Sequence, residues 1–259
     1  MRPITLEYHD VLSSGNFDAS GFPGAAANTY KMSSADFSAH LDVLRGRPGA
    51  GLDVRRTQGV EAPVLITFDD GGSSALEVSA PLLEARGFVG HFFMTTNQLN
   101  APTFCSAEAL RELVRRGHVV GSHSHTHPVR MAVLSDDEMD REWATSYDIL
   151  SELLGAPAIV ASVPGGYFSA RVARSAARAG IRYLFTSEPE TSISREGDCV
   201  VLGRYTLRRT SPASEVASLV SRAGLARTRQ WAVWNAKKAV KAVAGETYLR
   251  VRASILGDH

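Results

Sequence analysis

The sequence predicts an α/β fold in which about seven parallel strands alternate with helices around one core. Three observations favour this fold. The chain of 259 residues has the length of a single α/β barrel, which typically takes about 250 residues. Short apolar runs alternate with helical patterns, as in βαβ units. Polar, reactive residues follow strand after strand, and parallel barrels build their sites at the carboxyl ends of their strands.

The predicted strands are apolar runs bounded by polar or glycine-rich segments. In chain order they are Ile4–Tyr8, Val64–Phe68, Phe88–Thr95, His118–Gly121, Ile159–Ala161, Arg182–Thr186 and Val200–Leu202. The predicted helices are Ser34–Leu44, Ser74–Arg86, Ala107–Arg116, Ser135–Leu154, Ala170–Ala179, Ala213–Ala223 and Arg229–Val243. Ser135 and Glu138 form a capping-box pattern, and Gly155 is a typical helix stop. A loop rich in Gly, Ser and Ala is expected from Ser13 to about Thr29.

Composition is that of a globular protein, with 44% hydrophobic and 21% charged residues. Cys105 and Cys199 lie far apart without a CxxC pair, so we expect two free, buried thiols. The start, MRPITLEYHD, has no long apolar stretch after Arg2 and does not resemble a secretory signal. No apolar run approaches the roughly 18 residues of a membrane span. These features favour a cytoplasmic protein.

Charge is distributed unevenly along the chain. Arg204 to His259 holds 11 basic and 3 acidic residues, a net charge of +8, and the remainder holds 17 and 24, a net charge of −7. The end of the chain reads as a basic amphipathic helix that carries Trp231 and Trp234. Such a helix can lie on an anionic membrane surface, but we favour packing of its tryptophans on the barrel. No base-reading motif accompanies it, so no nucleic-acid partner is predicted.

Two adjacent carboxylates, Asp69 and Asp70, follow the predicted strand Val64–Phe68. Successive strand side chains point to opposite faces, so the chain must turn there for both carboxylates to meet, and Gly71-Gly72 allows the turn. A metal bound to one carboxylate would lower the repulsion between the pair and leave the other as a base. An acidic turn that caps the next helix is the alternative.

Three histidines alternate in the segment His123-Ser124-His125-Thr126-His127. His123 and His127 are spaced i, i+4, which places them on one side of a helical turn. The i, i+2 spacing instead suits paired ligands of an extended segment. Neutral imidazoles and a carboxylate are good zinc ligands. We favour His123 and His127 as ligands and expect His125 either to support a ligand or to lie at the rim of the site. A two-metal site that uses His123 and His125 is the alternative.

The pattern Thr67-Phe68-Asp69-Asp70-Gly71 with His123-Ser124-x-x-His127 resembles the polysaccharide deacetylase (NodB-homology) family, carbohydrate esterase family four. The similarity extends from about Leu6 to about Leu207. It implies a distorted (β/α) barrel with its site at the carboxyl ends of the strands. Residues 1–210 would form this barrel, and residues 211–259 a basic helical extension packed on the same domain.

The resemblance assigns roles to individual residues. Asp69 matches the family's catalytic base. The family's metal ligands correspond to Asp70, His123 and His127. One divalent ion is implied, zinc by chemical default, with other divalent transition metals open. Gly166 and Tyr167 stand in the third-motif position and are candidates for a backbone contact to the oxyanion.

Two family features have no match at their usual positions. The third motif, Ser162 to Tyr167, lacks the arginine that normally orients the base. The late histidine that acts as general acid is also missing. His9, in Tyr8-His9-Asp10, is similar to the early histidine of permuted family members, and we expect it to be the general acid because the first and last strands of a barrel adjoin.

The resemblance predicts a metal-dependent hydrolase that removes an N-acetyl group from an amino-sugar-containing glycan or glycolipid. A substrate at a membrane surface would suit the basic tail and a cytoplasmic, membrane-associated protein. Two alternatives are an amidohydrolase of a small cyclic amide and a catalytically inactive carbohydrate-binding relative.

Overall fold

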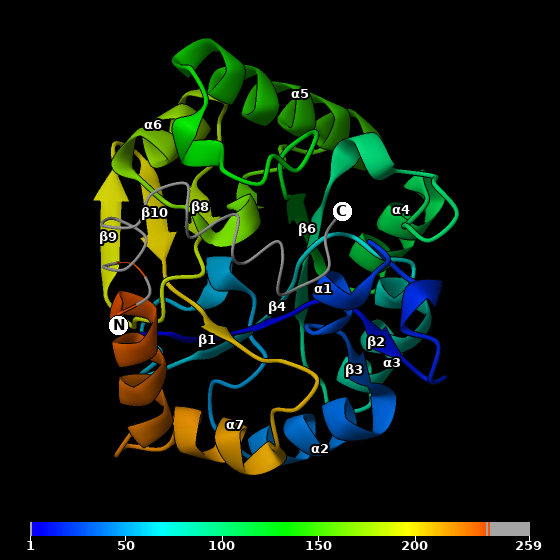
Figure 1. Ribbon diagram of the computed structural model, residues 1–259, viewed down its shortest axis with the longest axis vertical. Helices are drawn as coiled ribbons and strands as arrows, with labels where there is room; N and C mark the ends of the chain where they lie inside the picture. Colours follow the sequence, from blue (N-terminus) through cyan, green and yellow to red (C-terminus); the bar gives the residue numbers. More distant parts are fainter. Residues whose placement is uncertain (1, 237, 239–259) are drawn as a thin grey trace.

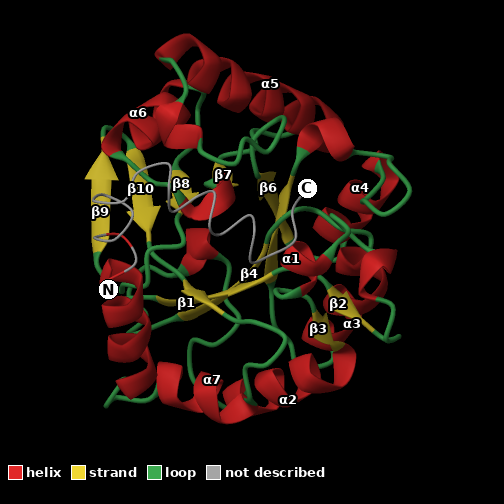
Figure 2. Ribbon diagram, viewed as in Figure 1, coloured by secondary structure: helices red, strands yellow, loops and turns green. Residues whose placement is uncertain are grey.

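The computed structural model describes residues 2–236 and 238, and within these residues nine strands form one central sheet (Figure 2). The strands are β1 (Ile4–Tyr8), β4 (Val64–Phe68), β5 (Gly90–Met94), β6 (Val119–Ser122), β7 (Val160–Ser162), β8 (Tyr183–Phe185), β9 (Ile193–Glu196), β10 (Cys199–Leu202) and β11 (Tyr205–Thr206). Their order across the sheet is β11-β1-β4-β5-β6-β7-β8-β10-β9. Every neighbouring pair is parallel except β9 and β10, so the predicted parallel sheet is confirmed.

The sheet curls into a distorted barrel. Strands β10 and β11 lie near opposite ends of the strand order, yet only Gly203 and Arg204 connect them. Three peptide units span at most about 11 Å, so the two ends of the sheet must approach each other. The predicted barrel is therefore confirmed, and its seven predicted strands are present with ends shifted by a few residues. Strands β9 and β11 were not predicted.

Helices surround the sheet (Figure 1). They are α2 (Ser34–Leu44), α3 (Ala80–Glu84), α4 (Ala107–Arg115), α5 (Asp136–Leu154), α6 (Ala170–Arg178) and α7 (Ala213–Val220). The predicted capping box is confirmed, because the Ser135 side chain accepts from the Glu138 N–H and the Glu138 side chain accepts from the Ser135 N–H. Helix α5 ends at Gly155, which has the left-handed conformation expected of a helix stop.

The predicted helix Ser74–Arg86 divides into two parts. Its first turns, η3 (Ala75–Ser79), are a π-helix, and α3 follows directly. Pro81 lacks an N–H and cannot complete the hydrogen bonding of a regular helix through this junction. The irregular turns follow the Asp69-Asp70 segment, and π-turns inside helices occur frequently at functional sites.

The segment expected to be a loop contains two short strands and two helical turns. These are β2 (Val11–Leu12), β3 (Met32–Ser33), η1 (Phe17–Ala19) and α1 (Ala25–Asn28). The buried Lys31 ammonium donates to the carbonyl oxygens of Phe17, Ser20 and Phe22, at 2.8, 2.6 and 2.6 Å. One side chain thereby fastens the whole segment from residue 17 to residue 22.

The core consists mainly of the apolar strands. All five residues of β4 are buried. The Phe68 ring stacks on Phe92 at a centroid distance of 4.7 Å and on Tyr8 at 5.7 Å. This rigid packing fixes the end of β4, where Asp69 begins. Cys105 and Cys199 are free and buried, as predicted.

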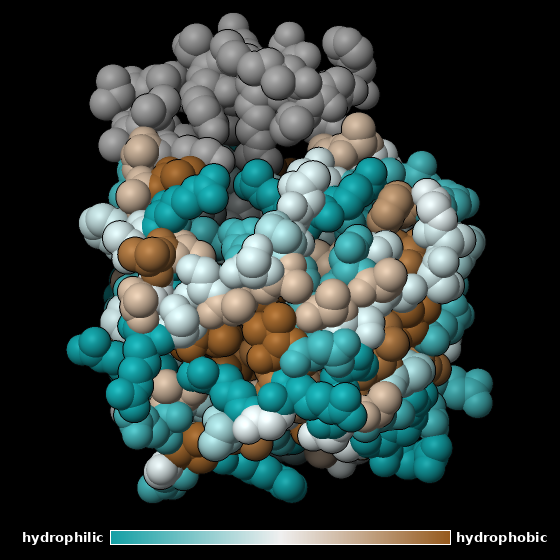
Figure 3. All heavy atoms as spheres, turned by 90° about the horizontal axis from the view of Figure 1, so that it is seen from below, coloured by the Kyte–Doolittle hydropathy of each residue, from teal (hydrophilic) through white to brown (hydrophobic). Residues whose placement is uncertain are grey.

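The described part of the C-terminal segment packs on the barrel. Helix α7 lies against α2, and residues 225–236 form a further helix. Figure 3 shows the face that carries α2 and α7, where hydrophilic side chains surround a hydrophobic middle. The rest of the predicted helix Arg229–Val243 lies outside the described residues, apart from Lys238. The division at residue 210 stays a prediction.

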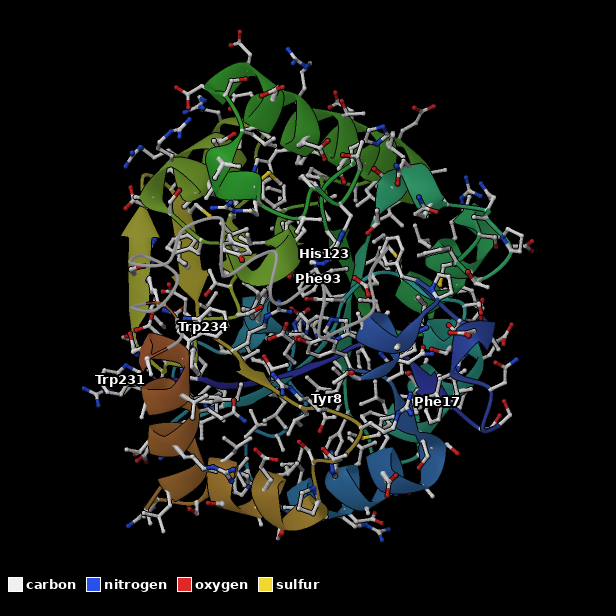
Figure 4. The ribbon with its side chains drawn as sticks, in the orientation of Figure 1. Tyr8, Phe17, Phe93, His123, Trp231 and Trp234 are labelled. Atoms are coloured by element: carbon white, nitrogen blue, oxygen red, sulfur yellow. The ribbon has the colours of Figure 1, made fainter. Side chains whose placement is uncertain are left out.

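Of the two tryptophans expected to pack on the barrel, only Trp234 does so. Trp231 is 54% exposed, and Figure 4 shows it on the outer side of its helix, with Trp234 on the inner side. Within the described part of the chain, no helix has both the length and the apolar character that a membrane span requires.

Candidate metal and catalytic site

Three predicted ligand residues, Asp70, His123 and His127, come together at the carboxyl ends of β4 and β6. The Asp70 Oδ1 atom lies 3.6 Å from His123 Nε2 and 3.5 Å from His127 Nε2. All three ligand atoms lie within 4.8 Å of one another. Asp70 and His123 are buried, whereas the His127 side chain is 24% exposed, so the group opens to one side.

The backbone bends sharply to bring these side chains together. Asp70 has φ of 74°, His127 has 58° and Ser124, between the two histidines, has 66°. Residues other than glycine rarely adopt this left-handed conformation, and such backbone strain gathers at functional sites. The sequence predicted the turn at Gly71-Gly72, but it already begins at Asp70.

The two imidazoles are held in defined orientations. His123 Nδ1 lies 3.1 Å from the Ser162 carbonyl oxygen, so Nδ1 carries the proton and Nε2 presents a lone pair to Asp70. Burial lowers the pKa of His123 to about 4, which keeps the ring neutral at pH 7. The Ser124 hydroxyl accepts from the His127 N–H at 3.1 Å, which fixes the tight turn.

The donor set fits a divalent transition metal. Two ligands at about 2.1 Å from a tetrahedral zinc ion lie about 3.4 Å apart, close to the two distances from Asp70 Oδ1. Two neutral imidazoles and one carboxylate are the ligands that zinc prefers in catalytic sites with a free position. Asp70, His123 and His127 would therefore hold the ion.

Asp69 lies beside this group but has a different partner. Its two carboxylate oxygens accept hydrogen bonds from Nη1 and Nη2 of Arg204, each at 2.7 Å. Its Oδ2 also lies 3.8 Å from His123 Nε2. Burial alone would raise the pKa of Asp69, but the charge and hydrogen bonds of Arg204, with His123, hold it well below its ordinary value. Asp69 is thus ionised at neutral pH.

Arg204 is fully buried and satisfies several groups at once. Besides Asp69, its guanidinium donates to the Ser162 hydroxyl at 2.8 Å and to Glu7 at 3.3 Å. Burial favours the neutral form, but Asp69 and Glu7 outweigh this effect and raise the pKa of Arg204 above its ordinary value. A buried arginine between two buried carboxylates is a compensated ionic cluster.

His9 also lies close to Asp69. His9 and Asp69 both line a cavity of about 10 Å³, which has room for about one water molecule. The His9 ring stacks on Tyr30 with centroids 5.0 Å apart, and His9 Nδ1 is buried without a hydrogen-bond partner among the described residues. Glu7, His9 and Asp69 could geometrically hold a second cation, but the guanidinium of Arg204 already balances both carboxylates.

The third-motif segment lies across the loop that carries His127. Gly165 has φ of 66°, and a Cβ there would lie 2.2 Å from the carbonyl oxygen of Val129. Gly166 has φ of 69° and lies against the Trp234 ring. The Tyr167 ring contacts the guanidinium of Arg130, whose Cζ is 5.3 Å from its centroid.

His125 does not join the ligand group. Its Nδ1 lies 3.0 Å from the Thr96 hydroxyl, and its side chain lines a groove of about 370 Å³ beside α5. Glu142 accepts from the backbone N–H groups of His125 and Thr126 at 2.9 and 2.8 Å, which anchors the loop from behind. His125 thus lies outside the ligand group, and its role stays a prediction.

Residues 57–184 match the model of the polysaccharide deacetylase family. The matched segment therefore belongs to the polysaccharide deacetylase family. A putative polysaccharide deacetylase of Bacillus subtilis is 21% identical over 181 residues, which cover 67% of this chain and 64% of that protein. The chain thus spans less than two thirds of that relative.

Solved structures of this family share the fold. A polysaccharide deacetylase from Bacillus cereus superposes with a TM-score of 0.73 at 19% identity, covering 85% of this chain and 69% of that one. A Streptococcus pyogenes deacetylase in complex with acetate superposes with a TM-score of 0.71 at 19% identity, covering 85% of this chain and 99% of that one.

The third motif of this chain lacks the arginine that the resemblance leads one to expect beside the base. Arg204, from a different part of the chain, contacts Asp69 instead. Sequence reasoning did not find Arg204. The only local signal is the short segment Gly203-Arg204 between two strand-forming runs, an unusual place for an arginine that is fully buried. The serine at the start of that motif, Ser162, contacts both Arg204 and Asp69, at 2.8 and 3.3 Å.

Proposed function

We propose that this chain is a metal-dependent hydrolase that removes an N-acetyl group from an amino-sugar-containing glycan or glycolipid. The observation that carries the proposal is the convergence of Asp70, His123 and His127 beside a second, ionised carboxylate, Asp69. The three ligand residues can hold a metal ion, while the neighbouring Asp69 remains available to accept a proton. Membership of the family and the likeness to a deacetylase that binds acetate support the reaction class.

Asp70, His123 and His127 would hold one divalent ion, with zinc as the first candidate. A bound ion would supply charge stabilisation at the amide carbonyl and lower the pKa of a water molecule. The neutral state of the buried His123 keeps its Nε2 lone pair free for this purpose at neutral pH.

Asp69 would be the general base. A base must be ionised when substrate arrives, and the contact with Arg204 keeps its carboxylate in that form. The same two hydrogen bonds fix the plane of the carboxylate, so that its orientation does not depend on the substrate. Arg204 would act through Asp69 as a positioning residue.

His9 would be the general acid that protonates the departing amine. It lies close to Asp69 and shares a small cavity with it. The stacked ring of Tyr30 would hold its imidazole in place. The backbone N–H groups of Gly166 and Tyr167 would contact the oxyanion, as the motif position implies.

The test is acetate release from N-acetylglucosamine oligomers and N-acetylated glycolipids, combined with metal analysis of the same protein. We expect Asp69→Asn to lower kcat by about 10²- to 10⁴-fold while metal content stays unchanged. Asp198→Asn, at an exposed carboxylate paired with Arg182, is the matched control and should retain full activity.

If Asp69→Asn behaves like the wild type, or if no metal binds, the proposal is wrong. Acetate release from none of these substrates by a metal-loaded protein would favour the two alternatives, a small cyclic amide as substrate or carbohydrate binding without catalysis.

We also propose a cytoplasmic location, with membrane contact through the basic C-terminal helix as a further property to test.

A further inference from the structure

Among the described residues, two arginines beside the candidate site form no ion pair with an acidic residue. Arg208 and Arg209 directly follow β11 and the buried Leu207, and both are exposed. Within residues 2–236 and 238, neither guanidinium forms an ion pair, whereas Arg204 pairs with Asp69 and Lys238 with Glu188. Among the described residues, the charges of Arg208 and Arg209 are therefore not balanced by an ion pair.

Aromatic rings hold these arginines in place. The Arg208 Cζ lies 5.6 Å from the centroid of the Tyr30 ring, which itself stacks on His9. The Arg209 Cζ lies 3.8 Å from the Phe17 centroid, and its Nη2 donates to the Asn28 carbonyl oxygen at 2.6 Å. A guanidinium stacked on a ring is already ordered, so less entropy is lost when it binds a ligand.

The neighbouring segment holds a buried cation, Lys31, with the carboxylates of Asp10 and Asp18 nearby. The buried ammonium of Lys31 is bound by three carbonyl oxygens and forms no ion pair among the described residues. Asp18, an acidic residue of this segment, accepts from the Gly24 N–H and the Asn28 side chain and stays ionised, but among the described residues it forms no ion pair with Arg208 or Arg209. A planar guanidinium with free N–H donors matches the geometry of a phosphate or a carboxylate.

We propose that Arg208 and Arg209 form an anion subsite beside Tyr30 and His9, for a phosphate or carboxylate group carried by the substrate. This inference rests on the proposed function, since it concerns the substrate of the same site. The stack His9–Tyr30–Arg208 links the subsite to the reacting groups. Anionic N-acetylated glycans would thus be preferred over neutral ones.

The test uses three matched substrates: a neutral N-acetylglucosamine tetramer, the same tetramer with a phosphate at its reducing end, and the same tetramer oxidised there to a carboxylate. The ratio of kcat/KM for each anionic substrate to that for the neutral one should be about tenfold in the wild type. In the double variant Arg208→Gln, Arg209→Gln this ratio should approach one. The two anionic arms distinguish phosphate from carboxylate.

The exposed Arg195 of the edge strand β9 provides the control, because Arg195→Gln removes a positive charge from another strand and should leave the ratio unchanged. A wild-type ratio near one, or an equal ratio in the double variant, overturns the inference.

If no substrate releases acetate, the proposed function fails, but the subsite is still tested by binding. Affinity for the phosphorylated tetramer, measured with a chelator present so that metal-bound phosphate does not contribute, should fall about tenfold in the double variant. Equal affinity in the wild type and the double variant overturns the subsite.

Discussion

Both carboxylate oxygens of Asp69 accept hydrogen bonds from Arg204, a residue 135 positions later in the sequence. The contact joins the end of β4 to the two-residue connection between β10 and β11. It exists only because the sheet curls and brings its two ends together. The orientation and ionisation of the proposed base therefore depend on closure of the barrel.

Arg204→Lys should change how activity depends on pH. A lysine is a point charge and cannot donate two parallel hydrogen bonds, so the carboxylate of Asp69 is held less firmly. Burial would then dominate, the pKa of Asp69 would rise, and the acidic limb of the kcat/KM profile should move to higher pH. Measuring the profile from pH 4 to pH 9 checks this expectation.

The surface pair of Arg182 and Asp198 offers the control, since Arg182→Lys alters an exposed ion pair of the same residue types. A profile for Arg204→Lys that is lower at every pH, without a shift of the acidic limb, would show that Arg204 serves only stability.

The metal content should be one divalent ion per chain. Asp70→Asn should reduce it to a small fraction, because Asp70 Oδ1 is the atom shared by both histidine contacts. His125→Gln should retain one ion, because His125 contacts Thr96 and lines a groove outside the ligand group. Elemental analysis of purified protein checks both; two ions in the wild type and one in His125→Gln would support the two-metal alternative instead.

The parts of the fold that the sequence predicted are those with a local cause. The apolar run before Asp69 predicts a buried strand, and Ser135 with Glu138 predicts the start of α5, because both signals involve residues close in sequence. Asp69, Asp70, His123 and His127 likewise stand out through their chemical type and spacing.

The missed features have causes that are distant in sequence. Strand β11 contains two residues, too few for any periodic pattern, and its pairing with β1 depends on the curl of the sheet. Arg204 carries no local sign of its partner Asp69. The stack of His9, Tyr30 and Arg208 similarly joins three segments that only the closed fold brings together.

Gly165→Ala should be more destabilising than Gly197→Ala. Both glycines have φ near 60°, a conformation that costs an alanine about 1–2 kcal/mol. A Cβ at Gly197 has no neighbour within 4 Å, whereas one at Gly165 would lie 2.2 Å from the Val129 carbonyl oxygen. Chemical denaturation compares the two variants directly.

Activity provides a second measure of the same pair. The loop with Val129 follows His127, so its displacement by Gly165→Ala should also lower kcat, while Gly197→Ala should leave it near the wild-type value. Equal stability and equal activity in both variants would contradict the close contact between the third motif and the His127 loop.

His91 should make the fold sensitive to acid. It is fully buried in β5; its Nδ1 donates to the Ile66 carbonyl oxygen and its Nε2 accepts from the Val54 N–H, both at 3.0 Å. Protonation of Nε2 would remove the lone pair that accepts this hydrogen bond and would bring two hydrogens into contact. Burial lowers the pKa of His91 to about 4, below the value of about 6.5 expected in the unfolded chain.

The sign of the effect follows from this difference. Between pH 6.5 and pH 4 the unfolded chain binds a proton that folded His91 does not, so the free energy of unfolding falls as pH falls, by about 3 kcal/mol in total from this group. His91→Gln should be less stable at pH 7.5 because it disturbs two buried hydrogen bonds, but it should lose less stability between pH 7.5 and pH 4.5. Urea unfolding at the two pH values measures both effects, with His125→Gln as the control at a half-buried histidine. An equal loss in wild type and His91→Gln would place the acid sensitivity at another residue.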